Sequence, residues 1–463
     1  MSRTLLLPRW VYLGRGEVAS GRAVLVEDNQ ITAVVPVDQQ IDAQRVELPG
    51  QLLLPGLMNM HTHVGAGPVG RAVSEDYQLP PGMPFYVPLS RLWRFAYTER
   101  FRAAFRAVLR WDTLAMMATG TTMIFNHAST DFEGYLAIAA ELGVRSYTGP
   151  TIPLDVTHRL GQLEAGAAHR PDLTAASGQQ AELDAITALF EAWDGSHGDR
   201  IRLVLGPAAV HTDDFSVLEG VAEAARRLGD PLVTTHLCQA PSELAETDRK
   251  YGKTPLRVLE DAGLANERLI AAHGTYLPDA DRDLAAKSGL TVVHCASRKA
   301  KEAITSPFVS FADSGIRTAL GTDGFSADMV TELKLAATLG KIATGETHRP
   351  TAAHVLDAAT ADAARSLGRD DLGVIRAGAL ADLVGVDLGH SLISPVFDPV
   401  QSLVYYSGGH AVRFQMIDGA VTMRDGALAG VDMTAARRAA ESALEDIWQQ
   451  AVEAGLLAEV LGA

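Results

Sequence analysis

The chain has too few cysteines and cations for several classes of protein. Cys238 and Cys295 are the only cysteines among 463 residues, which excludes a disulfide framework, so we expect a reducing, cytoplasmic setting. The 40 Lys and Arg residues stand against 56 Asp and Glu, a net charge of −16, which argues against nucleic acid and anionic membrane surfaces as partners. No apolar run reaches the roughly 18 residues of a membrane-spanning helix. Pro8 and Arg9 interrupt the apolar N-terminal stretch, so we expect no signal peptide.

The middle of the chain alternates short apolar runs with longer stretches of helical periodicity. Eight strands that alternate with helices are typical of a closed parallel (β/α)₈ barrel, also called a TIM barrel. We therefore predict an α/β barrel domain over residues 52–377. The eight apolar runs are residues 52–61, 121–127, 144–150, 201–210, 231–237, 268–274, 290–296 and 316–323.

Both ends of the chain show a different pattern, with alternating apolar and polar residues around tight turns such as Asp28-Asn29 and Asp418-Gly419. We expect residues 1–51 and 378–432 to pair into one small β-sandwich domain. The last segment, residues 433–463, is rich in Ala, Glu and Leu and predicts a C-terminal helix.

Four histidines and one aspartate fall at or just after the ends of predicted strands: His61, His63, His236, His273 and Asp323. In a barrel these strand ends meet at one mouth, where active sites lie. Imidazole and carboxylate groups together suit a divalent transition-metal ion, which lowers the pKa of a bound water from 15.7 toward about 7. Each residue alone has an ordinary structural explanation, a hydrogen-bonded core histidine or a turn-forming Asp before Gly.

Several motifs resemble those of the amidohydrolase superfamily. LPGLMNMHTH is similar to its first-strand signature, and TTHLCQ, IAAHGTYL and ALGTDG are similar to its strands five, six and eight, in the same order. GALADLVGVD and VRFQMIDGAV resemble its C-terminal return to a β-sandwich. Within the superfamily the chain is most similar to the branch of cytosine and guanine deaminases and triazine hydrolases, through YGKTPLRVLEDAGLANERLIAAHGTYL.

The resemblance implies roles for the five residues. His61, His63, His236 and Asp323 correspond to metal ligands, and His273 to the strand-six histidine beside the metal water. His273 and Asp323 are thus the expected catalytic groups for proton transfer. The family's second metal needs a carboxylated lysine on strand four, and residues 201–210 contain no lysine. We therefore expect one ion, zinc first, with iron and cobalt as alternatives.

Three positions depart from the deaminases of this branch. Gln239 stands where they have a proton-shuttling Glu, and an amide cannot carry a proton at neutral pH. Ala208 stands where they have a substrate histidine, and the segment after the seventh strand, residues 294–299, reads His-Cys-Ala-Ser-Arg-Lys. We expect substrate contacts from Gln239, His127, His294 and Arg298, although His127 and His294 serve equally well as structural residues and Arg298 as a surface ion-pair residue.

These departures favour an acyl substrate over an aminated ring. We expect a metal-dependent hydrolase that cleaves a C–N or C–S bond of an amide, urea or (thio)carbamate, near the phenylurea and thiocarbamate hydrolases of the superfamily. The alternative is a deaminase or dechlorinase of an aminated heterocycle of cytosine, guanine or triazine type, and a lesser alternative is a non-catalytic binding or assembly module. The expected partner is a small-molecule substrate, and the chain is expected to form a homo-oligomer.

Overall fold

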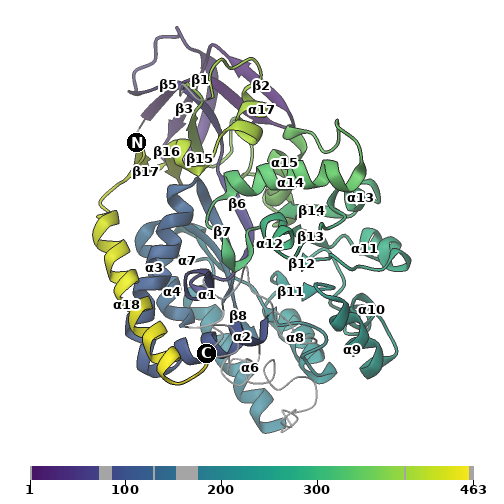
Figure 1. Cartoon of the computed structure of the whole chain (residues 1–463). Helices are drawn as coiled ribbons and strands as arrows, with labels where there is room; N and C mark the ends of the chain where they lie inside the picture. Colours follow the sequence, from purple (N-terminus) through teal and green to yellow (C-terminus); the bar gives the residue numbers. More distant parts are fainter. Residues whose placement is uncertain (1–2, 72–85, 129–130, 153–175, 390–392, 458–463) are drawn as a thin grey trace.

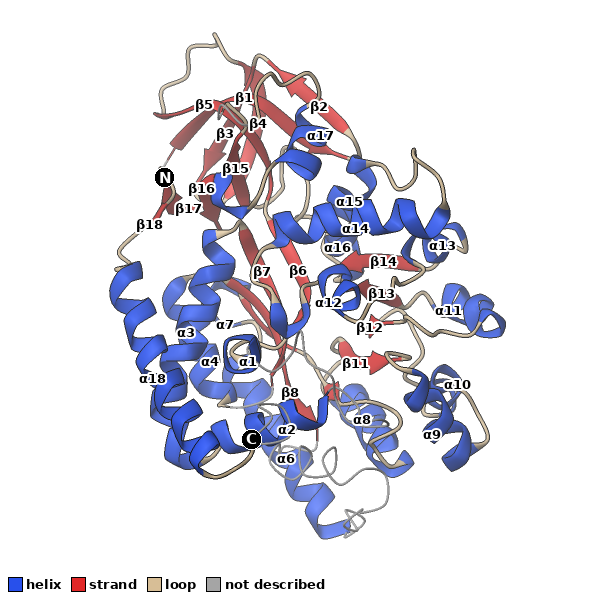
Figure 2. Cartoon of the chain, in the orientation of Figure 1, coloured by secondary structure: helices blue, strands red, loops and turns tan. Residues whose placement is uncertain are grey.

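The computed structural model describes residues 3–71, 86–128, 131–152, 176–389 and 393–457. A mostly antiparallel sheet lies at one end of the molecule, and shorter parallel strands surrounded by helices make up the rest (Figures 1 and 2). The fold is thus α/β.

The end sheet has nine strands and combines both ends of the chain. Its order is β18-β17-β16-β15-β5-β1-β3-β4, with β2 paired to β1. β5 is the meeting point, because it runs parallel to β1 and antiparallel to β15. The strands are β1 (Arg3–Gly14), β2 (Glu17–Ser20), β3 (Arg22–Glu27), β4 (Gln30–Pro36), β5 (Gln44–Pro55), β15 (Leu383–Asp387), β16 (Val412–Ile417), β17 (Ala420–Arg424) and β18 (Ala427–Leu428).

The alternation of side chains along β1 explains why this sheet is buried on both faces. Leu5 and Leu7 pack into one apolar cluster, whereas Leu6 between them packs into another, as the two-residue period of a strand requires. The described strands of the two ends form one sheet, so a sandwich of two sheets stays a prediction, as does the division of the chain at residues 51, 377 and 432.

The parallel strands follow the eight apolar runs, and each run contains at least one strand. β6 to β10 form one sheet in the order β10-β8-β7-β6, with β9 beside β8, and β11 to β14 form a second in sequence order. Their bounds are β6 (Leu57–Thr62), β7 (Thr121–Ala128), β8 (Arg145–Ile152), β9 (Ile201–Leu203), β10 (Gly206–Pro207), β11 (Val233–Leu237), β12 (Leu269–His273), β13 (Thr291–His294) and β14 (Arg317–Leu320).

The two parallel sheets are joined into one curl. Parallel bridges from Leu205 to Val233 and from Ala209 to His236 connect the first sheet to β11. At the other side, Asn59 of β6 donates to Thr322 Oγ1 at 2.7 Å and accepts from the Thr322 backbone N–H at 3.0 Å. The sheet therefore curls until the segment after β14 lies against β6, which brings the strand ends together.

Helices surround the curl. They include α1 (Ala66–Gly70), α2 (Tyr86–Ala96), α3 (Arg102–Ala118), α4 (Phe132–Leu142), α6 (Ala176–Trp193), α8 (Phe215–Arg227), α9 (Pro241–Tyr251), α10 (Pro255–Asp261), α11 (Arg282–Ser288), α12 (Ala296–Lys301), α13 (Phe308–Asp313), α14 (Met329–Thr344), α15 (Ala352–Ala358) and α16 (Ala361–Ser366). In the part of the chain that the structure describes, none of the helices has both the length and the apolar character needed to cross a bilayer.

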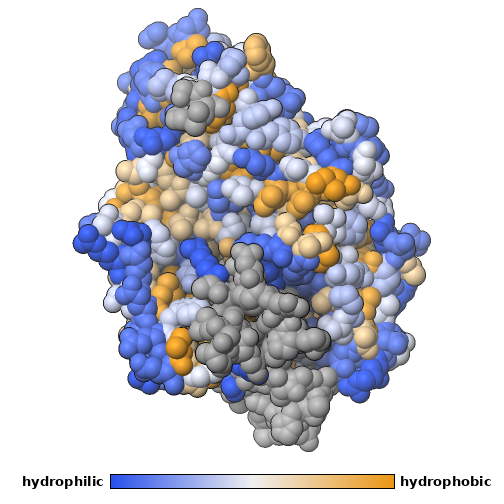
Figure 3. All heavy atoms as spheres, viewed as in Figure 1, coloured by the Kyte–Doolittle hydropathy of each residue, from blue (hydrophilic) through white to orange (hydrophobic). Residues whose placement is uncertain are grey.

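The last long helix, α18 (Met433–Glu453), runs along α3 (Figure 1). Its buried residues, Ala440, Ala443, Ile447 and Ala451, recur at helical spacing, and its outer face is hydrophilic (Figure 3). Trp448 donates its indole N–H to the Val69 carbonyl of α1 at 2.9 Å. The C-terminal helix is thereby tied to the segment that directly follows β6.

A buried ion pair fastens the end sheet to the parallel strands. Arg145, at the start of β8, makes a two-pronged contact with Asp382, which precedes β15, at 2.8 and 3.0 Å. The two side chains are 0% and 3% exposed. Such a buried pair is costly to break on one side, because the remaining charge has no partner.

Candidate metal centre

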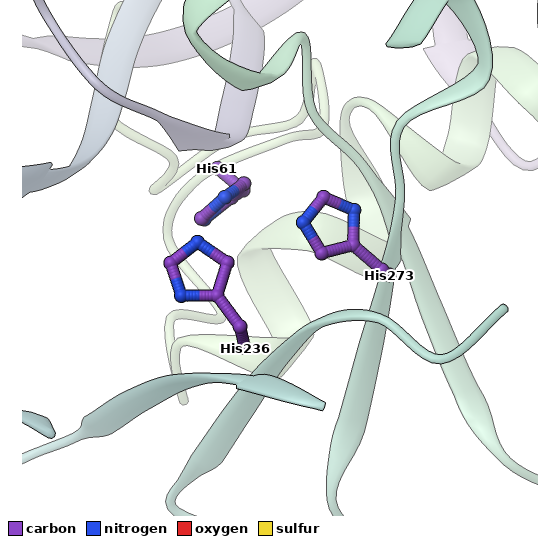
Figure 4. A group of neighbouring side chains, drawn as sticks. All are labelled: His61, His236 and His273. Atoms are coloured by element: carbon purple, nitrogen blue, oxygen red, sulfur yellow. The ribbon is translucent and has the colours of Figure 1, made fainter. Parts of the chain in front are cut away.

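Five side chains from four separate strands meet inside the curl. His61 belongs to β6 and His63 follows it, His236 lies in β11, His273 ends β12, and Asp323 comes three residues after β14. All of them except His63 are buried, and the His63 side chain is only 16% exposed. Figure 4 shows the rings of His61, His236 and His273 pointing toward one another. The strand ends thus converge at one place, as the spacing in the sequence predicts.

The ligand atoms are close enough to share one ion. His61, His236 and His273 offer nitrogens within 4.8 Å of one another, and so do His61, His63 and Asp323 with their nitrogens and carboxylate oxygen. The His63 and His236 Nε2 atoms are 3.1 Å apart, and His63 Nε2 is 3.8 Å from Asp323 Oδ1. His61 belongs to both groups, so it lies at the centre of the cluster.

The histidines fit a metal better than they fit each other. Both ring nitrogens of His61 and of His273 are buried, and they have no hydrogen-bond partner among the described residues. Burial lowers the pKa of both imidazoles well below the ordinary value, with nearby His63 adding to the effect on His61. A buried, neutral imidazole without a hydrogen-bond partner is costly. A transition-metal ion would satisfy it, because ions of this class bind neutral imidazole.

Backbone carbonyls orient two of the imidazoles. His63 Nδ1 is 2.8 Å from the His127 carbonyl and His236 Nδ1 is 2.7 Å from the Ala208 carbonyl. In each case the Nδ1–H donates the hydrogen bond, so the lone pair of the neutral imidazole is on Nε2. The Nε2 atoms of His63 and His236 face each other. The neighbouring strands therefore set the direction of the ligand atoms, and a side-chain exchange at position 127 or 208 leaves these hydrogen bonds in place.

Unusual backbone conformations gather at the same strand ends. His273, Asp323 and Cys238 all have positive φ, at 78°, 56° and 50°. Non-glycine residues seldom adopt this conformation, and when several do so together they mark a site where geometry is imposed on the chain. The loop after β14 also approaches α1 so closely that a Cβ at Gly67 would lie 1.7 Å from the Gly324 carbonyl oxygen. Glycine is needed there because any side chain would displace the Asp323 turn.

The loop after β11 carries Gln239, held by both of its backbone groups. Its N–H donates to Glu243 Oε2 at 2.6 Å, and its carbonyl accepts from Lys299 Nζ at 3.2 Å. Glu243, in the first turn of α9, also accepts from the Cys238 N–H at 2.9 Å. Burial raises the pKa of Glu243 to about 7, against the opposing effect of these backbone N–H groups and Lys299. Gln239 is therefore fixed in position although its own side chain cannot exchange protons.

The short helix after β13 adds two buried cations to the neighbourhood. Arg298 and Lys299 are 2% and 0% exposed, and both contact the carboxylate of Glu302. Arg298 Nε lies 3.9 Å from Asp323 Oδ2. The sequence predicts Arg298 near the site but gives no sign of Lys299, Glu302 or Glu243, since charged residues on short helices are usually solvated.

His127 and His294, the two remaining predicted site residues, differ in their distance from the candidate ligands. The His127 ring centroid is 5.1 Å from that of His236, so His127 borders the centre. His294 stacks on Phe308 of α13 with centroids 5.2 Å apart, and burial together with the charge of Lys299 lowers its pKa to about 4. His294 is thus a neutral, packed side chain, whereas His127 lies beside the candidate ligand His236.

Comparison with known proteins gives a family match and several full-length relatives. The model of the amidohydrolase family matches residues 52–422. A 5-methylthioadenosine/S-adenosylhomocysteine deaminase of Pyrococcus furiosus is 30% identical over 416 residues, 87% of this chain and 91% of the relative. A 5'-deoxyadenosine deaminase of Methanosarcina mazei is 28% identical over 437 residues, 93% of this chain and 94% of the relative.

Solved structures show the same fold. An adenosine deaminase from Xanthomonas campestris with bound zinc superimposes with a TM-score of 0.83 at 27% identity, covering 97% of this chain and 99% of the other. A triazine hydrolase variant superimposes with a TM-score of 0.82 at 22% identity, covering 96% and 100%, and this likeness concerns the fold alone. The deaminase relatives agree with the branch that the sequence motifs indicate, so that prediction is confirmed.

Proposed function

The chain belongs to the amidohydrolase family, and from this premise we propose that it is a hydrolytic deaminase of an aminated heterocycle. The family acts on C–N bonds with a metal ion, which confirms the prediction of a metal-dependent enzyme. The observation that carries the finer proposal is the set of full-length relatives, which are adenosine-type deaminases. They support the heterocycle alternative over hydrolysis of ureas or carbamates.

One divalent ion, zinc first, would be held by His61, His63, His236 and Asp323. When bound, such an ion lowers the pKa of water toward about 7 and so supplies hydroxide at neutral pH. The single-ion proposal draws support from His61, whose ligand atoms lie close to those of His63 and Asp323 in one group and to those of His236 and His273 in another. The absence of lysine in residues 201–210 supports it as well.

His273 and Asp323 are the residues proposed to move protons. His273 Nε2 lies 4.0 Å from Asp323 Oδ2, so the two groups lie side by side at the proposed reaction centre. As the water oxygen bonds to the ring carbon, one water proton goes to the Asp323 carboxylate and the ring nitrogen takes the electron pair of the opened C=N bond. The bond from that carbon to the exocyclic nitrogen then breaks, the amine leaves as ammonia with the proton from Asp323, and the ring C=N bond forms again on the hydroxylated carbon. His273 begins this sequence neutral because burial disfavours its cation.

Gln239, His127, His294 and Arg298 are the proposed substrate contacts, and they are not equivalent. Gln239 lies in the loop after β11 and Arg298 lies on α12. Lys299 of the same helix donates to the Gln239 carbonyl, and Arg298 Nε lies 3.9 Å from Asp323 Oδ2. His127 borders His236, whereas His294 is packed against Phe308 and is therefore the weaker candidate for a direct contact.

Hydrolysis of an amide, urea or (thio)carbamate is the second candidate, and Gln239 is the observation that favours it. Attack on an acyl carbon needs no protonation of a ring nitrogen, so an amide in place of the shuttle carboxylate is no handicap there. The cytoplasmic location and the homo-oligomer stay predictions.

A substrate panel with zinc-loaded protein tests the proposal. Amino-pyrimidines, amino-purines and amino-triazines are compared with aryl ureas, carbamates and anilides, and products are identified by mass together with released ammonia. We expect ammonia from at least one heterocycle and no aryl amine from the acyl substrates. Release of aryl amine without ammonia from any heterocycle would overturn the deaminase proposal in favour of the second candidate.

A further inference from the structure

The segment that follows the proposed ligand His63 has little rigidity of its own. Residues 64–70 read Val-Gly-Ala-Gly-Pro-Val-Gly, with glycine at three of seven positions, and α1 within them has only five residues. Glycine leaves the backbone free to change conformation, and an isolated helix of this length is unstable in water. Every residue of the segment is nevertheless buried. Its conformation therefore depends on contacts with the rest of the molecule.

Two buried side chains accept hydrogen bonds from the first N–H groups of the segment. Asn126 Oδ1, in β7, accepts from the Val64 N–H at 3.0 Å. Asp112 Oδ2, in α3, accepts from the Gly65 N–H at 2.8 Å. Asn126 and Asp112 are 2% and 4% exposed, so water has little access to replace either bond. The start of the segment is thus fixed to one strand and one helix of the curl.

Two indole groups donate to carbonyls of the same segment. Trp93 Nε1, in α2, lies 3.0 Å from the Ala66 oxygen, and Trp448 Nε1, in α18, lies 2.9 Å from the Val69 oxygen. The first pair is separated by 27 residues along the chain and the second by 379. α1 contacts both α2 and α18. The last long helix therefore completes the support of a segment near the start of the chain.

The segment also touches two of the proposed ligands. His63 directly precedes it, and Asp323 lies in a turn that packs on it. A Cβ at Gly67 would lie 1.7 Å from the Gly324 carbonyl oxygen, and a Cβ at Gly324 would lie 3.3 Å from Ala66 Cβ and 3.4 Å from His63 Cβ. A displacement of the segment would therefore move His63 and Asp323 relative to each other, and a metal site tolerates only small displacements of its ligands.

The Val69 carbonyl depends on Trp448 for its hydrogen bond. Val69 is the last residue but one of α1, and the final carbonyls of a helix have no partner within the helix itself. The Val69 side chain is 0% exposed, so the carbonyl lies in a buried stretch of backbone. Loss of the indole N–H would leave a buried acceptor unpaired, which is costly. The glycine-rich segment can reduce that cost only by moving.

We propose that Trp448 is a positioning residue of the metal centre, and that the C-terminal helix is thereby part of the functional site. Trp448 holds the Val69 carbonyl, and the segment 64–70 in turn keeps His63 and Asp323 at their separation. The inference rests on the proposed metal ligands of the proposed function and is independent of the substrate. It applies equally to a deaminase and to an acyl hydrolase.

Deletion of a single N–H group tests the inference. Trp448→Phe keeps an aromatic ring and removes the indole donor, and Trp93→Phe does the same at the Ala66 carbonyl. Each protein is loaded with cobalt, whose visible absorption depends on the geometry of its ligands, and separately with zinc, whose release to a chelator is timed well below the unfolding temperature. We expect both variants to shift the cobalt absorption bands and to release zinc about two- to tenfold faster than wild type, the effect of one hydrogen bond.

Ile447→Val is the matched control for a purely structural effect. It removes one methylene group from the buried face of α18 and leaves the indole donor in place. We expect Ile447→Val to lower the thermal midpoint about as much as Trp448→Phe does, and to keep the cobalt spectrum and the zinc release rate of wild type. A Trp448 that served only to pack the helix would make the two variants behave alike.

Failure of this inference is distinguishable from failure of the proposed function. A wild-type cobalt spectrum and zinc release rate in Trp448→Phe, or equal changes in Ile447→Val, would overturn the inference and leave the proposed chemistry intact. Wild-type protein that takes up neither metal would refute the proposed metal centre and the inference with it. Because none of these measurements needs turnover, a lack of ammonia release from every heterocycle would refute the deaminase proposal alone.

Discussion

The proposed metal-binding side of the site and its proposed substrate side are held together by different means. Backbone carbonyls of neighbouring strands direct His63 and His236, and left-handed backbone conformations place His273 and Asp323. On the substrate side, side-chain ion pairs among Arg298, Lys299 and Glu302 do this work. The first side is fixed by the course of the main chain, whereas the second can change through a few substitutions. Substitutions on the second side can therefore change substrate contacts without disturbing the main-chain geometry of the first.

The sharpest test of this contrast removes the ligand at the centre of the cluster. We expect His61→Ala to lose both zinc and activity entirely, because His61 belongs to both groups of candidate ligands. Metal analysis by mass spectrometry and a turnover assay measure the two effects. His348→Ala, at a side chain that is 76% exposed, serves as the control and is expected to change neither. Full zinc occupancy in His61→Ala would show that the ligand set is wrong.

The second test removes His273, the proposed proton-transfer group, and leaves in place the proposed ligands His61, His63, His236 and Asp323. We expect His273→Ala to keep its zinc and to lower kcat by at least about 10²-fold, the low end for a positioned acid–base group. Metal content and kcat are measured on the same preparation. Full activity of His273→Ala would show that another residue transfers the proton.

The third test concerns Glu243, whose carboxylate accepts hydrogen bonds from the backbone N–H groups of Cys238 and Gln239. Its carboxyl has a pKa of about 7 in the folded protein, above the ordinary value of 4.5, because burial disfavours the anion. The folded state therefore binds more protons than the unfolded state between about pH 4.5 and 7, so this contribution to stability is lost as pH rises through 7. We expect Glu243→Gln to abolish this fall in the free energy of unfolding, which amounts to about 1–3 kcal/mol.

Denaturant titrations at several pH values between 5 and 8 give the free energy of unfolding of wild type and of Glu243→Gln. The effect is the difference between the two curves of free energy against pH. The comparison of variant with wild type cancels the contributions of the metal-site histidines, which depend on pH in the opposite direction. Parallel curves would mean that Glu243 is ionised throughout the range.

The smallest expected effect belongs to Gln239. We expect Gln239→Ala to raise KM or lower kcat by about one hydrogen bond, 0.5–1.5 kcal/mol, because an amide donates and accepts but does not carry protons. Gln239→Glu restores a proton carrier and is expected to speed ammonia release from neutral aminated rings. A loss of several orders of magnitude in Gln239→Ala would place this residue among the catalytic groups instead.

The strands and the metal side follow directly from the sequence. Runs such as residues 231–237 are short and apolar, and the strands form where these runs predict because each is buried on both faces of a parallel sheet. The histidines at their ends converge because parallel strands bring their carboxyl ends to one side. The alternation in His61-Thr62-His63 already indicates that both rings face the same way, and their centroids are 4.9 Å apart.

The substrate side was harder to predict because burial there depends on tertiary contacts. The run Ala-Ser-Arg-Lys-Ala-Lys at 296–301 looks like a solvated helix, yet Arg298 and Lys299 are buried against Glu302 and the Phe325 ring. Gln239 is visible in the sequence as a departure from the deaminase motif. Its support by Glu243 depends on the turn that brings the first residues of α9 back onto the loop.

The position of β5 between β1 and β15 has a consequence for synthesis on the ribosome. One edge of β5 pairs with β1, which is made shortly before it, but its other edge, residues 51–55, pairs with residues 383–387, which are made much later. At roughly 5–20 residues per second the nascent chain spends on the order of 20–60 s with this apolar edge open. An unpaired strand edge invites pairing with other chains. Chaperones that hold nascent polypeptides are therefore expected to raise the yield of folded enzyme. Substitutions near the metal ligands, which leave this edge unchanged, are expected to alter that yield less.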